Sequence, residues 1–194
     1  FSAAVCGIDV DAVLSGARAM DVRVGTEDFF RNPAAIFAAV NHYYYQKGKN
    51  ASVIIPCINS LRDICLWYCR LNSQNLENVN GFSVLTYQKN SVDFYHSDAG
   101  KVYTFIEADG FGENDTLIDA SVLGSQDFKE LDGKKISELI NIEQNEAKEQ
   151  LAKNGRPYMS VIMNELSPYN IGALIYFLQT AAAMTAKLFN AQPQ

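Results

Sequence analysis

The sequence lacks a concentrated stretch of basic residues. Its 16 Lys and Arg stand against 22 Asp and Glu, which gives a formal net charge of −6, and the basic residues are scattered along the chain. Non-specific attraction to nucleic acid or to an acidic membrane surface needs a dense positive patch. We therefore expect neither nucleic acid nor a membrane as a partner.

Long hydrophobic runs and a leader sequence are also lacking. The most apolar stretch, Ile171 to Met184, carries Gln179 and Thr180 and is too short to span a bilayer, so it is predicted to be a core helix. Residues 1–11 show no basic region followed by an apolar run and a cleavage site, so no signal peptide is predicted. The abrupt start of the sequence suggests a piece of a longer protein.

The four cysteines lack the spacing of a zinc or redox motif. They are Cys6, Cys57, Cys65 and Cys69, and no pair is separated by two residues. Cys65 and Cys69 share one face of a predicted helix, but no further soft ligands lie near them in the sequence. We expect reduced thiols in a cytoplasmic protein, and no metal site or cofactor.

What the chain does have is 194 residues, 48% of them hydrophobic, which is enough for one well-buried domain. Apolar residues at helical spacing, with caps and terminators, predict helices after Asp9, from Asn32-Pro33, near Asn59, over Ile136 to Leu151 and over Pro168 to Phe189. Short β-branched runs predict strands at Ala51–Pro56, Phe82–Tyr87, Lys101–Glu107 and Tyr158–Met163. Strands alternating with helices predict an α/β domain with a mostly parallel sheet.

The segment between residues 108 and 133 gives no clear prediction. It is acidic and rich in loop-forming residues, with only a weak strand or turn pattern at Leu117 to Ala120.

Three segments carry a resemblance to a known family. The first runs from Asn32-Pro33-Ala34-Ala35 through His42-Tyr43-Tyr44 and Lys47-Gly48-Lys49-Asn50 to the strand ending in Pro56. The second is the helix with Leu61, Trp67-Tyr68 and Leu71. The third and most specific is Gly155-Arg156-Pro157, a strand, Glu165-Leu166 and Gly172-Ala173-Leu174-Ile175-Tyr176-Phe177. In this order and spacing they resemble the glucose-6-phosphate isomerase family, and weaker matches extend the similarity over nearly the whole chain.

The resemblance implies that residues 1–194 form a single domain similar to the second of the family's two sugar-isomerase (SIS) domains, with the ends of the parent protein missing. The implied fold is a flavodoxin-like three-layer αβα sandwich with a mostly parallel five-stranded sheet. The family interconverts glucose 6-phosphate and fructose 6-phosphate in glycolysis and gluconeogenesis. It uses a general base and no metal or redox cofactor. A sugar phosphate, a homodimer and a cytoplasmic location are therefore expected of the parent protein.

Compared residue by residue, the resemblance places Gln74 where the family has its glutamate base. An amide cannot accept the proton that the reaction moves between two carbons. Glu77, three residues further on, is a candidate substitute. The family's Gln-His-Ser sequence corresponds to the stretch from Gln88 to Ser91, which lacks the histidine, and these two residues are candidate substrate contacts. His96 is interpreted as a surface histidine.

The family's late lysine, its Gly-Gly-Arg segment and its phosphate loop would all lie outside this sequence. We therefore predict a domain of an isomerase homologue that is inactive as an isolated chain. The alternative is a non-catalytic module of the same fold that binds a sugar phosphate or forms dimers. An unrelated flavodoxin-like domain would still place its ligand at the carboxyl ends of the strands, although no Gly-rich loop opens a helix after a strand.

Overall fold

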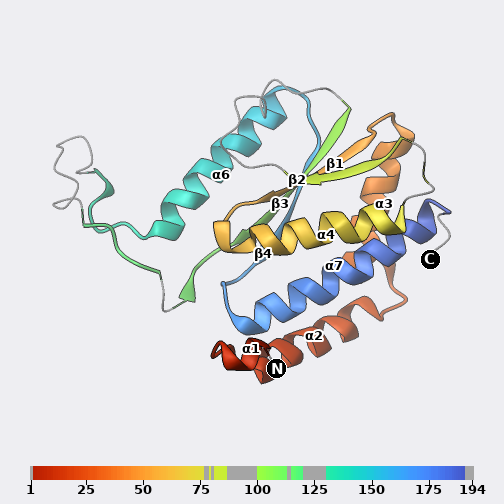
Figure 1. The fold of residues 1–194 in the computed structure, drawn as a ribbon. Coiled ribbons are helices and arrows are strands. Elements are labelled where there is room, and N and C mark those ends of the chain that lie inside the picture. Colours follow the sequence, from red (N-terminus) through yellow and green to blue (C-terminus); the bar gives the residue numbers. More distant parts are fainter. Residues whose placement is uncertain are drawn as a thin grey trace.

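The computed structural model describes residues 2–76, 79, 81–86, 100–112, 115–119 and 130–190. The chain folds into helices around a sheet (Figure 1). In chain order the elements are α1 (Ser2–Val5), α2 (Val10–Val24), a 3₁₀ turn (Phe29–Arg31), α3 (Pro33–Gln46), β1 (Ala51–Pro56), a second 3₁₀ turn (Asn59–Leu61), α4 (Arg62–Asn75), β2 (Ser83–Thr86), β3 (Lys101–Ala108), α6 (Ile136–Lys153), β4 (Tyr158–Met163) and α7 (Pro168–Leu188).

The predicted helix starts are confirmed, and capping side chains explain three of them. Asp9 accepts a hydrogen bond from the Ala12 N–H at 2.9 Å and opens α2. Asn32 does the same for the Ala35 N–H at 3.0 Å, and Ser167 caps α7 through the Asn170 N–H at 3.4 Å. A proline follows both Asn32 and Ser167, and its fixed φ suits the first helical position.

The sheet is parallel throughout its described strands, in the order β2-β1-β3-β4. β1 has its predicted bounds and is buried on both faces. Tyr87, the end of the predicted second strand, lies outside the described residues. The α/β class with a flanked parallel sheet is confirmed, and the described residues contain four strands where five were expected. The weak strand expected from Leu117 is a single antiparallel bridge to Lys135.

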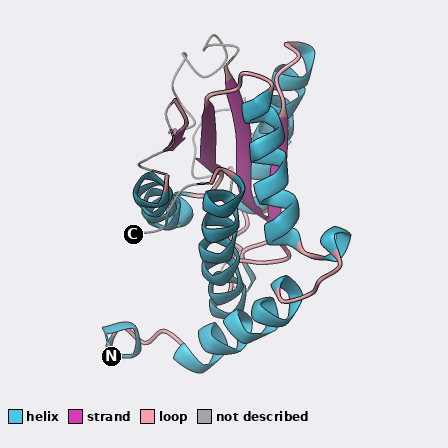
Figure 2. Cartoon of the chain, turned by 90° about the vertical axis from the view of Figure 1, so that its right-hand side faces the viewer, coloured by secondary structure: helices cyan, strands magenta, loops and turns pink. Residues whose placement is uncertain are grey.

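Alternate residues of the central strands point to opposite layers. Val53, Ile55, Tyr103 and Phe105 pack with two residues of α6, Ala147 and Leu151. Ile54 and Ile106 instead join the larger core formed with α3, α4 and α7. The sheet therefore lies between α6 on one side and α3, α4 and α7 on the other (Figures 1 and 2). α2 forms an outer layer against α7.

Helix α7 is the one helix in the described part of the chain that is long and apolar enough to cross a membrane by length and composition. It lies against α2, α3 and α4, and eight of its residues are buried. Burial of this kind is typical of a core helix, which is the role the sequence predicts.

Candidate functional site

The carboxyl ends of the parallel strands form the edge where open α/β sheets generally bind ligands. Asp109 follows β3 directly. The loop after β4 is joined to the loop after β3, because the Leu166 N–H donates to the Gly110 carbonyl at 2.8 Å. The exposed Glu165 carboxylate reaches over Gly112, where a Cβ would lie 3.7 Å from Glu165 Oε2. Two loops from neighbouring strands thus bring carboxylates to this edge.

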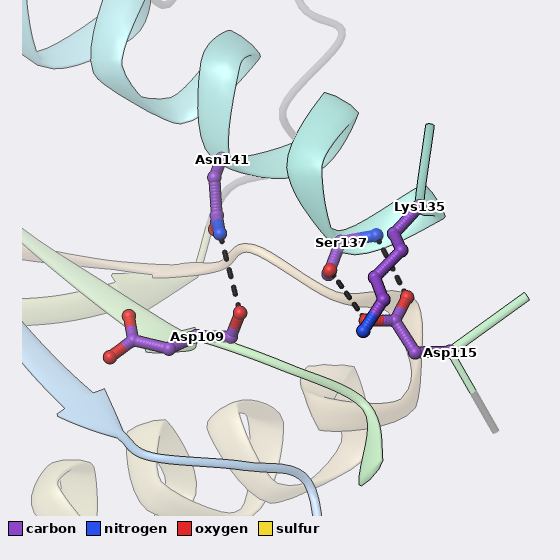
Figure 3. Close-up of polar contacts among 5 residues, drawn as sticks. All are labelled: Asp109, Asp115, Lys135, Ser137 and Asn141. Carbon is purple, nitrogen blue, oxygen red and sulfur yellow. Dashed lines mark hydrogen bonds and ion pairs between the residues drawn. The ribbon is translucent and has the colours of Figure 1, made fainter. Parts of the chain in front are cut away.

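The amino end of α6 contacts the same edge through the polar side chains shown in Figure 3. Asp115 accepts hydrogen bonds from the Ser137 hydroxyl at 2.7 Å and from the Ser137 N–H at 3.2 Å, and Lys135 Nζ lies 3.9 Å from its Oδ2. Asn141, one turn further along, donates a long 3.5 Å bond to the Asp109 carbonyl. The bond from the Ser137 hydroxyl, supported by the Ser137 N–H and by Lys135, lowers the pKa of Asp115 below its usual value.

Two of the helix amino ends at this edge, those of α6 and α7, are capped by side chains of the chain itself. Asp115 accepts hydrogen bonds at the start of α6, and Ser167 with Pro168 caps the start of α7. The start of α4 has no side-chain cap, but the carboxylate of Asp63 lies in its first turn. A phosphate binds to such an end through free N–H groups and the positive end of the helix dipole. Because capping side chains use these groups at α6 and α7, and Asp63 brings negative charge to the first turn of α4, none of the three ends favours a phosphate.

A buried polar cluster lies between β3 and α6. Lys148 Nζ contacts Glu107 Oε2 at 2.6 Å, and their side chains are only 14% and 8% exposed. Lys148 also lies over the Phe105 ring, 5.5 Å from its centroid. Glu107 Oε1 and both polar atoms of the Gln144 side chain have no hydrogen-bond partner among the described residues. The ion pair therefore joins β3 to α6 within a partly unsatisfied polar environment.

Gln74, the residue aligned with the family's base, lies in the last turn of α4 and is exposed. Cys65, Tyr68 and Asn72 form the buried face of the helix, and Gln74 is turned away from that face. Because α4 starts after the carboxyl end of β1 and extends for about 20 Å, its last turn is remote from Asp109. The structure does not bring Gln74 together with the polar groups at the carboxyl edge.

The other predicted site residues cannot be placed. Glu77, Gln88 and Ser91 lie outside the described residues, and so does His96. Their proposed roles remain predictions from the sequence.

Cys65 and Cys69 lie in surroundings that favour the protonated thiol. Burial, and secondarily the neighbouring Cys69, raises the pKa of the Cys65 thiol to about 12, and burial raises the pKa of Cys69 to about 11. Thiols with such pKa values stay protonated near neutral pH, whereas metals bind the thiolate. Within the part of the chain that the structure describes, no three His, Cys, Asp or Glu side chains come together as a metal site.

Sequence reasoning did not single out Asp109, Asp115 or Ser137. An aspartate followed by glycine directly after a buried strand could have pointed to Asp109, since that is where parallel sheets place functional side chains. No local pattern links Asp115 to Ser137, because 22 residues separate them.

No family model matches the chain. The chain is 31% identical over 196 residues to the glucose-6-phosphate isomerase of Carboxydothermus hydrogenoformans, an alignment that covers 93% of this chain and 42% of the relative. It is 26% identical to that of Methanocaldococcus jannaschii, with coverage of 95% and 46%. The chain thus spans less than half the length of these curated relatives, and the resemblance inferred from the sequence is confirmed.

Solved structures agree on the fold. A hypothetical protein from Thermus thermophilus superposes with a TM-score of 0.86 at 20% identity, over 96% of this chain and 47% of that chain. A glucose-6-phosphate isomerase from Chlamydia trachomatis gives a TM-score of 0.71 at 15% identity, with coverage of 94% and 39%.

Proposed function

We propose that this chain, a homologue of glucose-6-phosphate isomerases over nearly its whole length, acts as the second sugar-isomerase domain of a longer isomerase homologue and is inactive by itself. The observation that carries this proposal is that the alignment covers nearly all of this chain but less than half of the relative. About 93% of this chain aligns with only 42% of a 31% identical relative. A parent protein of that kind would act on a sugar phosphate in the cytoplasm, as a homodimer and without a metal or redox cofactor.

The chemistry of Gln74 supports inactivity. Aldose–ketose isomerisation needs a group that takes a proton from one carbon and returns it to the next, so the group must change its protonation state near neutral pH. A carboxamide can donate and accept hydrogen bonds but has no such equilibrium. Gln74 is also exposed in the last turn of α4.

The negative charge at the carboxyl ends of the strands supports the view that the isolated chain does not bind the phosphate of the substrate. Asp63, Asp109, Asp115 and Glu165 are described carboxylates at this edge, and the amino end of α6 is capped by Asp115. A phosphate dianion placed there would meet negative charge and, at the start of α6, an N–H group that already donates to Asp115. We infer that the phosphate of the substrate is held by another part of the parent protein.

The test is an assay of the 194-residue chain for conversion of glucose 6-phosphate to fructose 6-phosphate, coupled to a reporter enzyme. We expect no turnover above background for the wild type and for Gln74→Glu, because a carboxylate alone does not restore the phosphate site. Thermal unfolding of Gln74→Glu serves as the folding control, and an exposed substitution is expected to change stability by less than about 0.5 kcal/mol. Wild-type turnover that survives Gln74→Ala would overturn both the proposal and the assignment of the base position.

Isothermal titration with fructose 6-phosphate distinguishes this proposal from the alternative, a non-catalytic module that binds a sugar phosphate. The proposal predicts little or no binding to the isolated chain. Micromolar affinity would instead favour a stand-alone module that binds sugar phosphates.

A further inference from the structure

A hollow of about 450 Å³ opens beside β4, the last strand of the sheet. Its floor is made by Phe37, Leu174 and Phe177, which are buried core residues. Facing the strand across the hollow are residues of α2 and α3: Ala19, Met20, Arg23, Pro33, Ile36 and Val40. We call this hollow the β4 slot.

The outer backbone edge of β4, which pairs with no strand among the described residues, forms one wall of the slot. The Tyr103 N–H donates to the Pro157 carbonyl at 3.1 Å and the Asp109 N–H donates to the Met163 carbonyl at 2.9 Å. Since backbone groups alternate along a strand, the carbonyl and N–H groups of Ser160 and Ile162 point away from β3. Both residues line the slot. The slot therefore borders a row of peptide groups that can pair with another strand.

The side chains of β4 leave this edge open to pairing. Residues Tyr158 to Met163 include no charged residue and no proline, which are the usual protections of an exposed edge strand. Tyr158 is 42% exposed and Ile162 is 54% exposed. Met159 and Val161 pack against the main core, so the helix-facing side of the edge is apolar.

We propose that the β4 slot binds an extended segment of a partner polypeptide, which pairs with β4 as an additional strand of the sheet. Alternate side chains of the segment enter the slot and contact Met20, Ile36 and Val40, so an apolar residue is required at every second position. The segment also carries an acidic residue that pairs with Arg23. This inference is independent of the isomerase assignment.

The shape of the slot favours a single strand over a second copy of the chain. A second copy would bring its own helix layers against both faces of its sheet. α2 and α3 already face the outer edge of β4 across the slot, in the space that those layers would need. A volume of about 450 Å³ accommodates a few side chains, in the range of a small binding pocket.

Arg23 supplies the charge preference. It lies in the last turn of α2, is exposed, and forms no ion pair among the described residues. The slot otherwise contains apolar and neutral polar side chains. A carboxylate on the partner segment would gain an ion pair here, whereas a basic residue would be repelled.

The test is selection of binders from a phage-displayed library of random dodecapeptides against the 194-residue chain. We expect enriched peptides with apolar residues at alternate positions and one Asp or Glu. Arg23→Glu is expected to weaken a selected peptide by roughly tenfold or more and to select peptides with Lys or Arg at the acidic position. Arg18→Glu, an exposed substitution on the same helix and outside the slot, is the matched control and should leave binding unchanged.

Strand addition has a readout that other binding modes do not share. On addition of a selected synthetic peptide, the backbone amides of Ser160 and Ile162 should become protected from hydrogen exchange, together with alternate amides of the peptide. Failure to enrich peptides would overturn the proposal. So would peptides that bind Arg23→Glu and wild type equally, or protection confined to α2 and α3. A wild-type dimer in sedimentation experiments with the β4 amides protected would assign the slot to a second copy instead.

Discussion

Asp115 fixes the start of α6 from outside the helix. The residue at the N-cap position, Lys135, has no side-chain acceptor, so the first amides of α6 depend on another group. Asp115 accepts from both the Ser137 N–H and the Ser137 hydroxyl, and its side chain is only 5% exposed. One carboxylate therefore joins the loop after β3 to the helix that covers the sheet.

Removal of this cap is expected to destabilise the chain. Asp115→Ala should lower the free energy of unfolding at pH 7, as measured by urea denaturation, because the first turn of α6 loses its capping acceptor. Because the pKa of Asp115 is lowered in the folded chain, its contribution is fully present above the usual aspartate pKa and is lost as the pH falls through the folded value. The difference between wild type and variant should therefore shrink in acid.

The matched control for the cap is Glu146→Gln on the exposed face of α6, where a change below about 0.5 kcal/mol is expected. An unchanged difference between wild type and Asp115→Ala at acid pH would contradict the ionic origin of the effect.

The Glu107–Lys148 pair offers a second prediction at this scale. Lys148→Met leaves the Glu107 carboxylate buried without its partner, and we expect a loss on the order of 3 kcal/mol in urea denaturation. Adding Glu107→Gln to Lys148→Met should recover part of that loss, because the unpaired charge is removed. Lys153→Met is the control: its partner Glu149 lies 3.7 Å away, both side chains are about two-thirds exposed, and the expected change is below about 0.5 kcal/mol. Equal losses for Lys148→Met and Lys153→Met would contradict this account.

Among the elements, α2 and α7 make the closest contact. Gly16 and Gly172 face the partner helix so closely that a Cβ on Gly172 would lie 1.9 Å from the Val13 carbonyl oxygen. A Cβ on Gly16 would lie 1.8 Å from the Tyr169 carbonyl oxygen. These atoms are backbone and cannot rotate away. Each glycine is therefore needed for its lack of a side chain, although glycine is a weak helix former.

Gly172→Ala should separate the two helices. The gain in helix propensity, about 1 kcal/mol, is smaller than the cost of moving backbone apart, so we expect a net loss of at least about 2 kcal/mol in thermal or urea unfolding. Hydrogen exchange in α2 should accelerate. Gly110→Ala is the control, because its Cβ would meet the nearest atom only at 4.0 Å. A neutral Gly172→Ala with unchanged exchange in α2 would disprove the close crossing.

Element positions were largely predictable from the sequence. The capping groups of α2 and α3, and the apolar run of β1, are local patterns, and local geometry decides them. The loop after β3 was not predictable. Its contacts join residues far apart in the chain, as the pairing of Asp115 with Ser137 illustrates.

In the molecule as a whole, three of the four thiols are enclosed by the sandwich. Cys65 has no exposed surface, Cys57 and Cys69 are 6% and 8% exposed, and Cys6 is on the surface. The raised pKa values of Cys65 and Cys69 add to this protection, because the protonated thiol is a poor nucleophile.

Thiol titration with Ellman's reagent therefore reports on the integrity of the sandwich. At pH 8 the native chain should show one thiol that reacts rapidly, and guanidinium should reveal all four. Cys6→Ser should abolish the rapid phase. Rapid reaction of two or more thiols in the native chain would contradict the burial of Cys57, Cys65 and Cys69.

The candidate site was predictable only in part. The resemblance singled out Gln74 by its distance in sequence from Trp67-Tyr68, and the structure places it on the exposed end of α4. Its distance from Asp109 could not be inferred, because that distance depends on the strand order and on how α4 packs across the sheet. The position of β4 at the edge of the sheet could not be inferred from the sequence either. The apolar composition of this strand is also typical of a central strand.

The sequence by itself determined the α/β class, most element bounds and the relationship to glucose-6-phosphate isomerases, because these depend on periodicity, caps and ordered motifs along the chain. Only the tertiary structure decided the strand order, the helix crossing at Gly16 and Gly172, the cap from Asp115 and the slot beside β4. Each of these joins residues that are distant in sequence, and no local preference specifies which distant groups meet.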